Sequence, residues 1–264
     1  MLLEGKVAII TGGAKGMGRG MAVRFAAEGC AVAIADIAMK EAEEAVAEIK
    51  KKGGKAIAIK CDVTNIKQVG ETVAQVIKNF GKIDILINNA GAIAAHTPVE
   101  DLTEEAWDKV LALNLKSDFL FCKFVVPYMK KQQSGKIINL SSIGAIQPPA
   151  HEIHYNTAKA GVIGFTNDLS VALAPFNINV NCMLPGPIRT HFYDGRVSKM
   201  TAEEQDAFFK RLGKKVPLGR VGTPEDMAGA ALFLASSLSD YVTGHALHVG
   251  GGLPLQPSAP PAGT

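Results

Sequence analysis

The sequence has few cysteines, and none of them stands at metal-binding or redox spacing. The four are Cys30, Cys61, Cys122 and Cys182. Because no C-x-x-C pair is present, the pattern argues against a zinc site and against a disulfide framework. The chemistry of this protein is therefore expected to rest on other side chains.

Long apolar runs and a strong net charge are also lacking. No run approaches the ~20 residues of a membrane-spanning helix, and Glu4 interrupts the apolar start of the chain in a way that signal peptides do not. The net charge is only +3, and the densest basic run is Lys50-Lys51-Lys52. That run closes a helix opened by acidic residues, which suits the helix dipole. We expect a cytoplasmic protein that binds neither nucleic acid nor a membrane.

What the chain does contain is a regular alternation of short apolar segments and helical segments. The expected strands are 7–10, 31–35, 56–60, 83–87, 136–140, 178–183 and 246–249. This alternation predicts an α/β fold, a single-domain doubly wound parallel sheet of Rossmann-like type with helices on both faces. We assign this domain to residues 1–252. The four prolines among residues 253–264 predict an extended C-terminal tail.

A glycine-rich turn follows the first expected strand. Gly12, Gly16 and Gly18 lead into a helical segment. Glycines adopt positive φ and let the backbone approach a pyrophosphate, while a helix N-terminus presents free N–H groups to it. The spacing is one residue longer than the usual G-x-G-x-x-G fingerprint. The flanking strand and helix nevertheless favour a dinucleotide site over the alternative of an ordinary loop.

The residue that ends the second expected strand indicates which dinucleotide binds. Asp36 lies eighteen residues after Gly18, near the offset of an acid that binds the adenosine ribose hydroxyls, as in NAD sites. Lys15 could instead attract the 2′-phosphate of NADP. Repulsion between Asp36 and the two charges of that phosphate, at ~5 Å and an effective dielectric of ~40, costs about 3 kcal/mol, so NAD is favoured. The alternative role for Asp36 is to cap the next helix.

Tyr155 and Lys159 form the strongest chemical pair in the sequence. Four residues apart on a helix, they share one face. Bringing a phenol from a pKa of about 10 to near 7 takes roughly 4 kcal/mol. An ammonium at ~4.5 Å supplies about 3.7 kcal/mol at an effective dielectric of ~20, whereas burial acts in the opposite direction. Ser142, thirteen residues before Tyr155, is a candidate to make the cleft polar.

Taken in order, these motifs resemble the short-chain dehydrogenase/reductase family, from about Gly5 to Gly252. Asn114, Ser142, Tyr155 and Lys159 are similar to its catalytic tetrad in order and spacing. The resemblance implies that Tyr155 exchanges a proton with the substrate oxygen during hydride transfer and that Ser142 binds this oxygen. It implies that Lys159 lowers the pKa of Tyr155 and binds the nicotinamide ribose, while Asn114 holds a water. The local alternative for Asn114 is to satisfy helix backbone.

The same resemblance implies a homotetramer, a site without metal, and an NAD site built from several loops. The expected cofactor-binding residues are Gly12, Lys15, Gly16, Met17, Gly18, Asp36, Asp62, Val63, Asn89, Ala90, Gly91, Tyr155, Lys159, Pro185, Gly186, Ile188 and Thr190.

Substrate identity is the least constrained expectation. Residues 144–153 are expected to line one wall, with Gln147 joining Ser142 and Tyr155 as a substrate contact. Residues 191–212 are expected to cover the opening, with a capping box at Thr201 that predicts a helix. His96, His151, His191 and Tyr193 are weaker candidates for substrate contacts. A secondary alcohol or ketone fits such a mixed wall, and sugar, steroid, acyl thioester and aromatic alcohol all remain open.

Two other classes of function share parts of this pattern. A methyltransferase also joins a glycine-rich turn to an acid after the second strand, but it leaves Ser142, Tyr155 and Lys159 unexplained. A non-catalytic NAD-binding sensor or scaffold on the same fold is the stronger alternative, because fold alone does not imply function. Binding of NADH without turnover of any ketone would favour the sensor.

Overall fold

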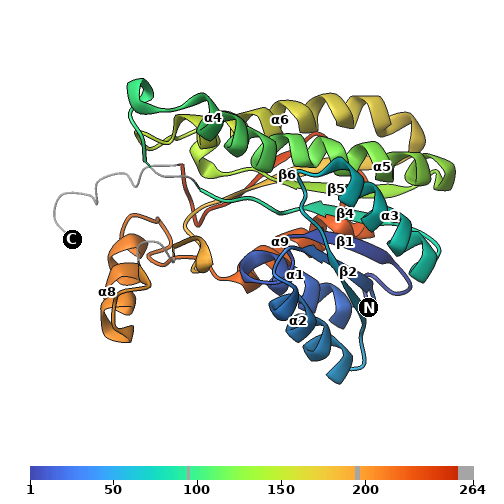
Figure 1. Ribbon diagram of the computed structural model, residues 1–264. Helices are drawn as coiled ribbons and strands as arrows, with labels where there is room; N and C mark the ends of the chain where they lie inside the picture. Colours follow the sequence, from blue (N-terminus) through green and yellow to red (C-terminus); the bar gives the residue numbers. More distant parts are fainter. Residues whose placement is uncertain (94–95, 194–196, 255–264) are drawn as a thin grey trace.

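The computed structural model describes residues 1–93, 96–193 and 197–254, and a single parallel sheet forms its centre (Figure 1). The seven strands of this sheet lie in the order β3-β2-β1-β4-β5-β6-β7. Every neighbouring pair is parallel. The strands are β1 Val7–Thr11, β2 Ala31–Asp36, β3 Lys55–Lys60, β4 Ile85–Asn88, β5 Gly135–Leu140, β6 Ile178–Pro185 and β7 Ala246–Val249. The doubly wound α/β fold predicted from the sequence is confirmed, and β4 begins two residues later than expected.

Helices cover both faces of this sheet (Figure 1). One face carries α1 Gly16–Ala27, α2 Met39–Lys51 and α9 Pro224–Ala235, and the other carries α3 Ile66–Phe80, α4 Glu104–Leu111, α5 Ser117–Gln132 and α6 Ile153–Leu173. A further helix, α8 Ala202–Gly213, lies to the side of the sheet. Short turns complete the path: η1 Val99–Asp101, η2 Ala112–Lys116, η3 Ile143–Ala145, η4 Ala174–Phe176, η5 His191–Tyr193 and η6 Ser237–Ser239.

Local sequence explains where several helices begin and end. Asn65 accepts hydrogen bonds from two backbone N–H groups at the start of α3, and Gly81, at φ +79°, ends the helix in the left-handed conformation. The expected capping box at Thr201 opens α8, and a second one, between Thr223 and Asp226, opens α9.

The core lies on the two faces of the sheet, because parallel strands buried on both sides are apolar throughout. Every residue of β1 is buried. Phe25 of α1 and Phe121 of α5 are fully buried on opposite faces. The strand order reverses beside β1, so the crevice at the carboxyl ends of β1 and β4 is where such folds bind ligands.

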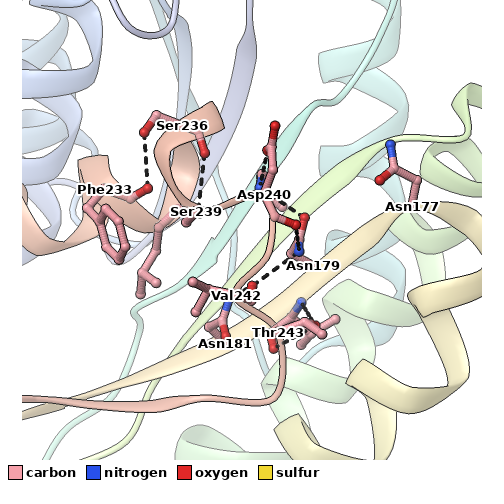
Figure 2. Close-up of polar contacts among 12 residues, drawn as sticks. Asn177, Asn179, Asn181, Phe233, Ser236, Ser239, Asp240, Val242 and Thr243 are labelled. Carbon is pink, nitrogen blue, oxygen red and sulfur yellow. Dashed lines mark hydrogen bonds and ion pairs between the residues drawn. The ribbon is translucent and has the colours of Figure 1, made fainter.

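Two asparagines of β6 fix the last part of the chain against the sheet (Figure 2). Asn179 donates to the carbonyl oxygens of Asp240 and Val242, at 3.0 and 3.1 Å. Asn181 also donates to Val242, at 2.9 Å. These bonds hold the segment after α9 so that β7 pairs with β6, which places residues 249–252 beside the end of β6.

The division into a domain at residues 1–252 and a tail at residues 253–264 stays a prediction, since residues 255–264 lie outside the described part of the chain. Within that described part, no helix has both the length and the apolar character that crossing a membrane requires.

Candidate active site

A cavity of about 330 Å³ opens at the carboxyl ends of β1 and β2, where the dinucleotide was expected. Most of the expected cofactor residues line it: Gly12, Lys15, Gly16, Met17, Asp36, Asp62, Val63, Asn89, Ala90, Gly91 and Thr190. These residues come from five separate loops of the chain. The fold therefore gathers into one cavity residues that the sequence spreads over nearly two hundred positions.

The glycine turn leaves its backbone open to this cavity. Gly12 and Gly16 have positive φ, +61° and +53°. A Cβ on Gly12 would lie 3.0 Å from the Ala90 Cα, and a Cβ on Gly18 would overlap the Gly12 carbonyl oxygen. The N-terminus of α1 has no side-chain cap, so its N–H groups are available to an anion. A bare, positively polarised cradle of this kind fits the pyrophosphate of a dinucleotide.

Thr11 and Asn89 join this turn to the loop after β4. The Asn89 side chain donates to the carbonyl oxygens of Thr11 and Gly12, at 2.9 and 3.0 Å. The Thr11 hydroxyl accepts from the backbone N–H groups of Asn89 and Ala90, both at 2.9 Å. Two walls of the cofactor cavity are thus held together by hydrogen bonds of the protein itself.

Asp36 is held beside the glycine turn by two backbone hydrogen bonds. Its two carboxylate oxygens accept from the backbone N–H groups of Ala14, at 2.9 Å, and Ala38, at 3.0 Å. Helix α2 begins at Met39, and its N-cap position, Ala38, receives no side-chain bond. Asp36 is thus not the N-cap of α2, although it does order the turn that precedes this helix.

Lys15 pairs with an acid at the rim of the same cavity. Its ammonium lies 2.7 Å from the Glu41 carboxylate, and this contact lowers the pKa of Glu41. The positive charge that could attract the 2′-phosphate of NADP therefore has a countercharge beside it.

A second cavity, of about 220 Å³, adjoins the first at Met17 and Thr190, which line both. Ser142 and Tyr155 line it, as do Pro185, Gly186 and Ile188 of the loop after β6. Ser142 opens the η3 turn, where its hydroxyl accepts from the Gly144 N–H at 3.1 Å. The expected proton-transfer residues thus lie directly beyond one end of the dinucleotide cavity.

The electrostatics of Tyr155 depend mainly on its burial. Burial raises the pKa of Tyr155 to about 12, the hydrogen bond with Ser142 acts to lower this pKa, and the charge of Glu152 raises it further. The Lys159 ammonium lies 5.9 Å from the centroid of the Tyr155 ring, so the two side chains are neighbours on α6. Burial is thus the largest influence on this pKa, and the expectation that Lys159 brings the phenol near neutrality stays a prediction.

Lys159 is itself buried, with 4% of its surface exposed. Its ammonium donates to the Leu140 carbonyl oxygen at 2.8 Å. Burial lowers the pKa of Lys159, and the charge of Asp118 opposes this shift. Asp118, in the first turn of α5, is buried as well, and its own pKa is raised to about 7 by burial. The sequence analysis did not single out Asp118.

Asn114 lies in a π-helical turn, η2, between α4 and α5. Its amide donates to the carbonyl oxygens of Ala92 and Val110, both at 3.0 Å, and its oxygen accepts from the Ala92 N–H at 3.2 Å. The local role that the sequence left open, satisfying backbone groups, is therefore present. A Cβ on Gly91 would lie 2.7 Å from the Asn114 oxygen and 3.3 Å from the Lys159 nitrogen, so these residues are neighbours. The water proposed for Asn114 stays a prediction.

The substrate wall differs in detail from the expectation. Gln147 is exposed beyond the η3 turn and does not line the cavity. His151 is exposed, and His191 lies along the cofactor cavity. The wall does contain Glu152, from the expected segment 144–153, and Tyr193, one of the weaker candidates. Glu152 was missed, although its position three residues before Tyr155 on one helix face was a usable signal.

The expected cover is anchored by a small aromatic cluster of its own. Tyr193 and Phe209 are both buried and pack edge to face, with ring centroids 5.6 Å apart. Phe208 joins them at the same face of α8. A larger cavity, of about 640 Å³, lies between α1, α8 and α9. Ser142, Tyr155 and Lys159 do not line it, so its size does not mark the reaction site.

The chain is similar to known reductases and dehydrogenases over nearly its whole length. A family model described as enoyl-(acyl carrier protein) reductase matches residues 12–254. The 3-oxoacyl-(acyl-carrier-protein) reductase FabG of Thermotoga maritima is 40% identical over 253 residues, 96% of this chain and 99% of that protein. Dehydrogenase/reductase SDR family member 4 of Homo sapiens is 36% identical over 252 residues, 96% of this chain and 88% of that protein.

Solved structures give the same picture. The crystal structure of levodione reductase has a TM-score of 0.89 to this chain at 30% identity, and the match covers 95% of this chain and 98% of the other. The similarity to reductases and dehydrogenases therefore extends over the sheet, the glycine turn and the loops of both cavities.

Proposed function

The chain belongs to the short-chain dehydrogenase/reductase family and is a hydride-transferring oxidoreductase, and we propose that it works on a secondary alcohol or ketone with Tyr155 as the general acid/base. The observation that carries this proposal is the continuity of the two cavities. Ser142 and Tyr155 lie in the smaller cavity, and Met17 and Thr190 connect it to the dinucleotide cavity. A carbonyl group beside Tyr155 would thus lie within reach of a nicotinamide.

The side chains support a simple division of labour. When bound, the nicotinamide cofactor of this family supplies or accepts the hydride. The Ser142 hydroxyl donates a hydrogen bond to the substrate oxygen, and the Tyr155 phenol gives this oxygen a proton in reduction or removes it in oxidation. With a pKa of about 12 in the free protein, Tyr155 carries its proton at neutral pH, which suits a proton donor. The buried Lys159 ammonium stabilises the phenolate that forms when the proton leaves.

Within the NAD(P)(H) cofactors of the family, we favour NAD. The Asp36 carboxylate, held by two backbone N–H groups, retains lone pairs that can accept the ribose hydroxyls, and it repels a 2′-phosphate. Lys15 is paired with Glu41 at 2.7 Å, so its attraction for that phosphate is reduced. The proposal also includes a cytoplasmic homotetramer, as the resemblance to the family implies.

A screen of secondary alcohols with NAD, and of ketones with NADH, tests this function. We expect NADH fluorescence to report binding and at least one alcohol or ketone to be turned over, with loss of turnover in Tyr155→Phe. If NADH binds and no member of a broad panel reacts, the alternative of a non-catalytic NAD-binding sensor or scaffold is supported instead.

A further inference from the structure

We propose that Glu152 determines the charge of the substrate that this cleft accepts. The buried carboxylate selects an alcohol or ketone that carries a hydrogen-bond donor, a hydroxyl or ammonium group, on the carbon next to the reacting one. It disfavours substrates that carry a carboxylate or phosphate there. This inference rests on the proposed function, because it assumes that the cleft beside Tyr155 holds the substrate.

The position of Glu152 carries the argument. Only 5% of its surface is exposed, and it lines the same cavity as Ser142 and Tyr155. It immediately precedes α6, so that Tyr155 follows three residues later on the same side of the helix. The charge of Glu152 acts on the Tyr155 phenol and raises its pKa. A carboxylate that interacts electrostatically with the proton-transfer group also interacts with a substrate group adjacent to it.

The partner of Glu152 lies on the outer side of the cleft. His96 Nε2 lies 2.9 Å from Glu152 Oε1, and 46% of the His96 side chain is exposed. A backbone hydrogen bond from the Thr97 N–H to the His151 carbonyl oxygen, at 2.9 Å, holds the two segments together. His96 itself does not line the cavity. Glu152 is therefore the member of this pair that lines the cleft. His96 contacts its carboxylate from outside the cavity lining.

The charge of Glu152 can discriminate between substrates because the cavity is small and protein atoms, not water, surround most of a bound ligand. A like charge near a partly buried carboxylate is screened far less than in bulk water. A donor next to the carboxylate gains a charge-assisted hydrogen bond, which is stronger than a neutral one. A substrate with a methyl group in place of the donor experiences neither the repulsion nor the hydrogen bond. Discrimination by such a group is typically 10-fold or more.

The competing interpretation is that Glu152 and His96 only clasp two loops. Two substitutions separate this interpretation from ours. Glu152→Gln keeps an oxygen that accepts from His96 but removes the negative charge. His96→Gln keeps a side chain that can donate to Glu152 but removes any positive charge beside it. A clasp predicts the same small effect of both substitutions on all ligands. Selection by charge predicts that Glu152→Gln, but not His96→Gln, improves the binding of a negatively charged ligand.

Three ketones of nearly equal size provide the test: acetoin, 3-methyl-2-butanone and pyruvate carry a hydroxyl, a methyl or a carboxylate next to the carbonyl. Their dissociation constants are measured by stopped-flow fluorescence of the NADH-loaded protein, read before hydride transfer consumes the NADH. We expect acetoin to bind most tightly and pyruvate at least roughly 10-fold more weakly. Glu152→Gln should reduce this ratio at least 5-fold, and His96→Gln should increase it or leave it unchanged.

The inference is overturned if pyruvate binds the wild-type protein as well as acetoin does, or if both variants shift all three ketones equally. Because the readout is binding, it does not depend on turnover. A protein that shows the expected order of affinities but oxidises NADH with no ketone would contradict the proposed function and leave the charge selection standing. A protein that reduces ketones through Tyr155 without this order would do the reverse.

Discussion

The cofactor cavity and the substrate cavity are built in different ways. Hydrogen bonds that start from buried strand ends fix the first: Thr11 at the end of β1 and Asn89 after β4 bind each other's backbone. The second is closed by loops and by a separate aromatic cluster around Tyr193 and Phe209, outside the two main cores. We propose that the first cavity holds the cofactor common to the family and that the second holds the substrate.

Because of this difference, substitutions should act on different measurements. A change in the cofactor cavity should alter NADH affinity or the choice between NAD and NADP. A change in the substrate cavity, such as Glu152→Gln, should alter the order of substrates and leave NADH affinity unchanged. A substitution that moved both sets of constants together would mean that the two cavities are one cooperative unit.

The largest effect is expected at Gly18. A Cβ there would overlap the Gly12 carbonyl oxygen and lie 2.7 Å from the Asn89 amide nitrogen. Forcing an atom into a packed site costs roughly 1–3 kcal/mol, and because the strain falls on the pyrophosphate cradle, Gly18→Ala should weaken NADH binding roughly 10²-fold. Isothermal titration with NADH measures this change.

Gly229→Ala in α9 is the matched control, because nothing lies within 4 Å of a Cβ at this position. It should leave NADH affinity unchanged and stabilise the helix by up to about 1 kcal/mol. Equal NADH affinities for Gly18→Ala and the wild type would contradict the assignment of the glycine turn to the pyrophosphate.

A comparable effect is expected on the choice of dinucleotide. The wild type should prefer NAD to NADP by roughly 10²-fold in kcat/KM at low salt, and Asp36→Ala should narrow this preference by removing about 3 kcal/mol of repulsion. Lys15→Ala should widen it only a few-fold, since Glu41 already neutralises Lys15. Steady-state kinetics with both cofactors measure the ratios. A wild-type preference for NADP would contradict the assignment.

The smallest effect, and one that depends on pH, is expected at Asp118. Its pKa is about 7, so below pH 7 it is mostly protonated and Asp118→Asn should behave like the wild type. Above pH 7 the wild-type carboxylate is charged and holds the pKa of Lys159 up. Without it, Lys159 loses its proton at lower pH, and kcat/KM should fall roughly 10-fold at pH 9, as for a shift of one pKa unit. Superimposable pH profiles would show that Asp118 is only structural.

The helices and strands of this fold were predictable from the sequence because hydrophobic periodicity and helix-capping residues are local signals. Apolar runs marked the strands to within about two residues, and Thr223-Pro224 marked the start of α9. The glycine turn and Asp36 were found for the same reason, since their spacing to neighbouring strands is fixed by the chain itself.

What the sequence did not reveal depends on distant contacts. The π-helical turn at Asn114 forms where its side chain binds Ala92 and Val110 at once. The charge interaction between Asp118 and Lys159 links α5 to α6. The exposure of Gln147 follows from the path of the chain after η3. The burial that raises the pKa of Tyr155 is likewise a property of the packed molecule.

The most direct test of the central claim follows a deuterium atom. With NADH that carries deuterium at both positions of nicotinamide C4 and a ketone identified in the screen, we expect an alcohol with deuterium on its carbinol carbon, detected by mass spectrometry. Tyr155→Phe should form it at least roughly 10²-fold more slowly while binding NADH with wild-type affinity, because only the proton donor is lost. Deuterated product formed by Tyr155→Phe at the wild-type rate would contradict the account.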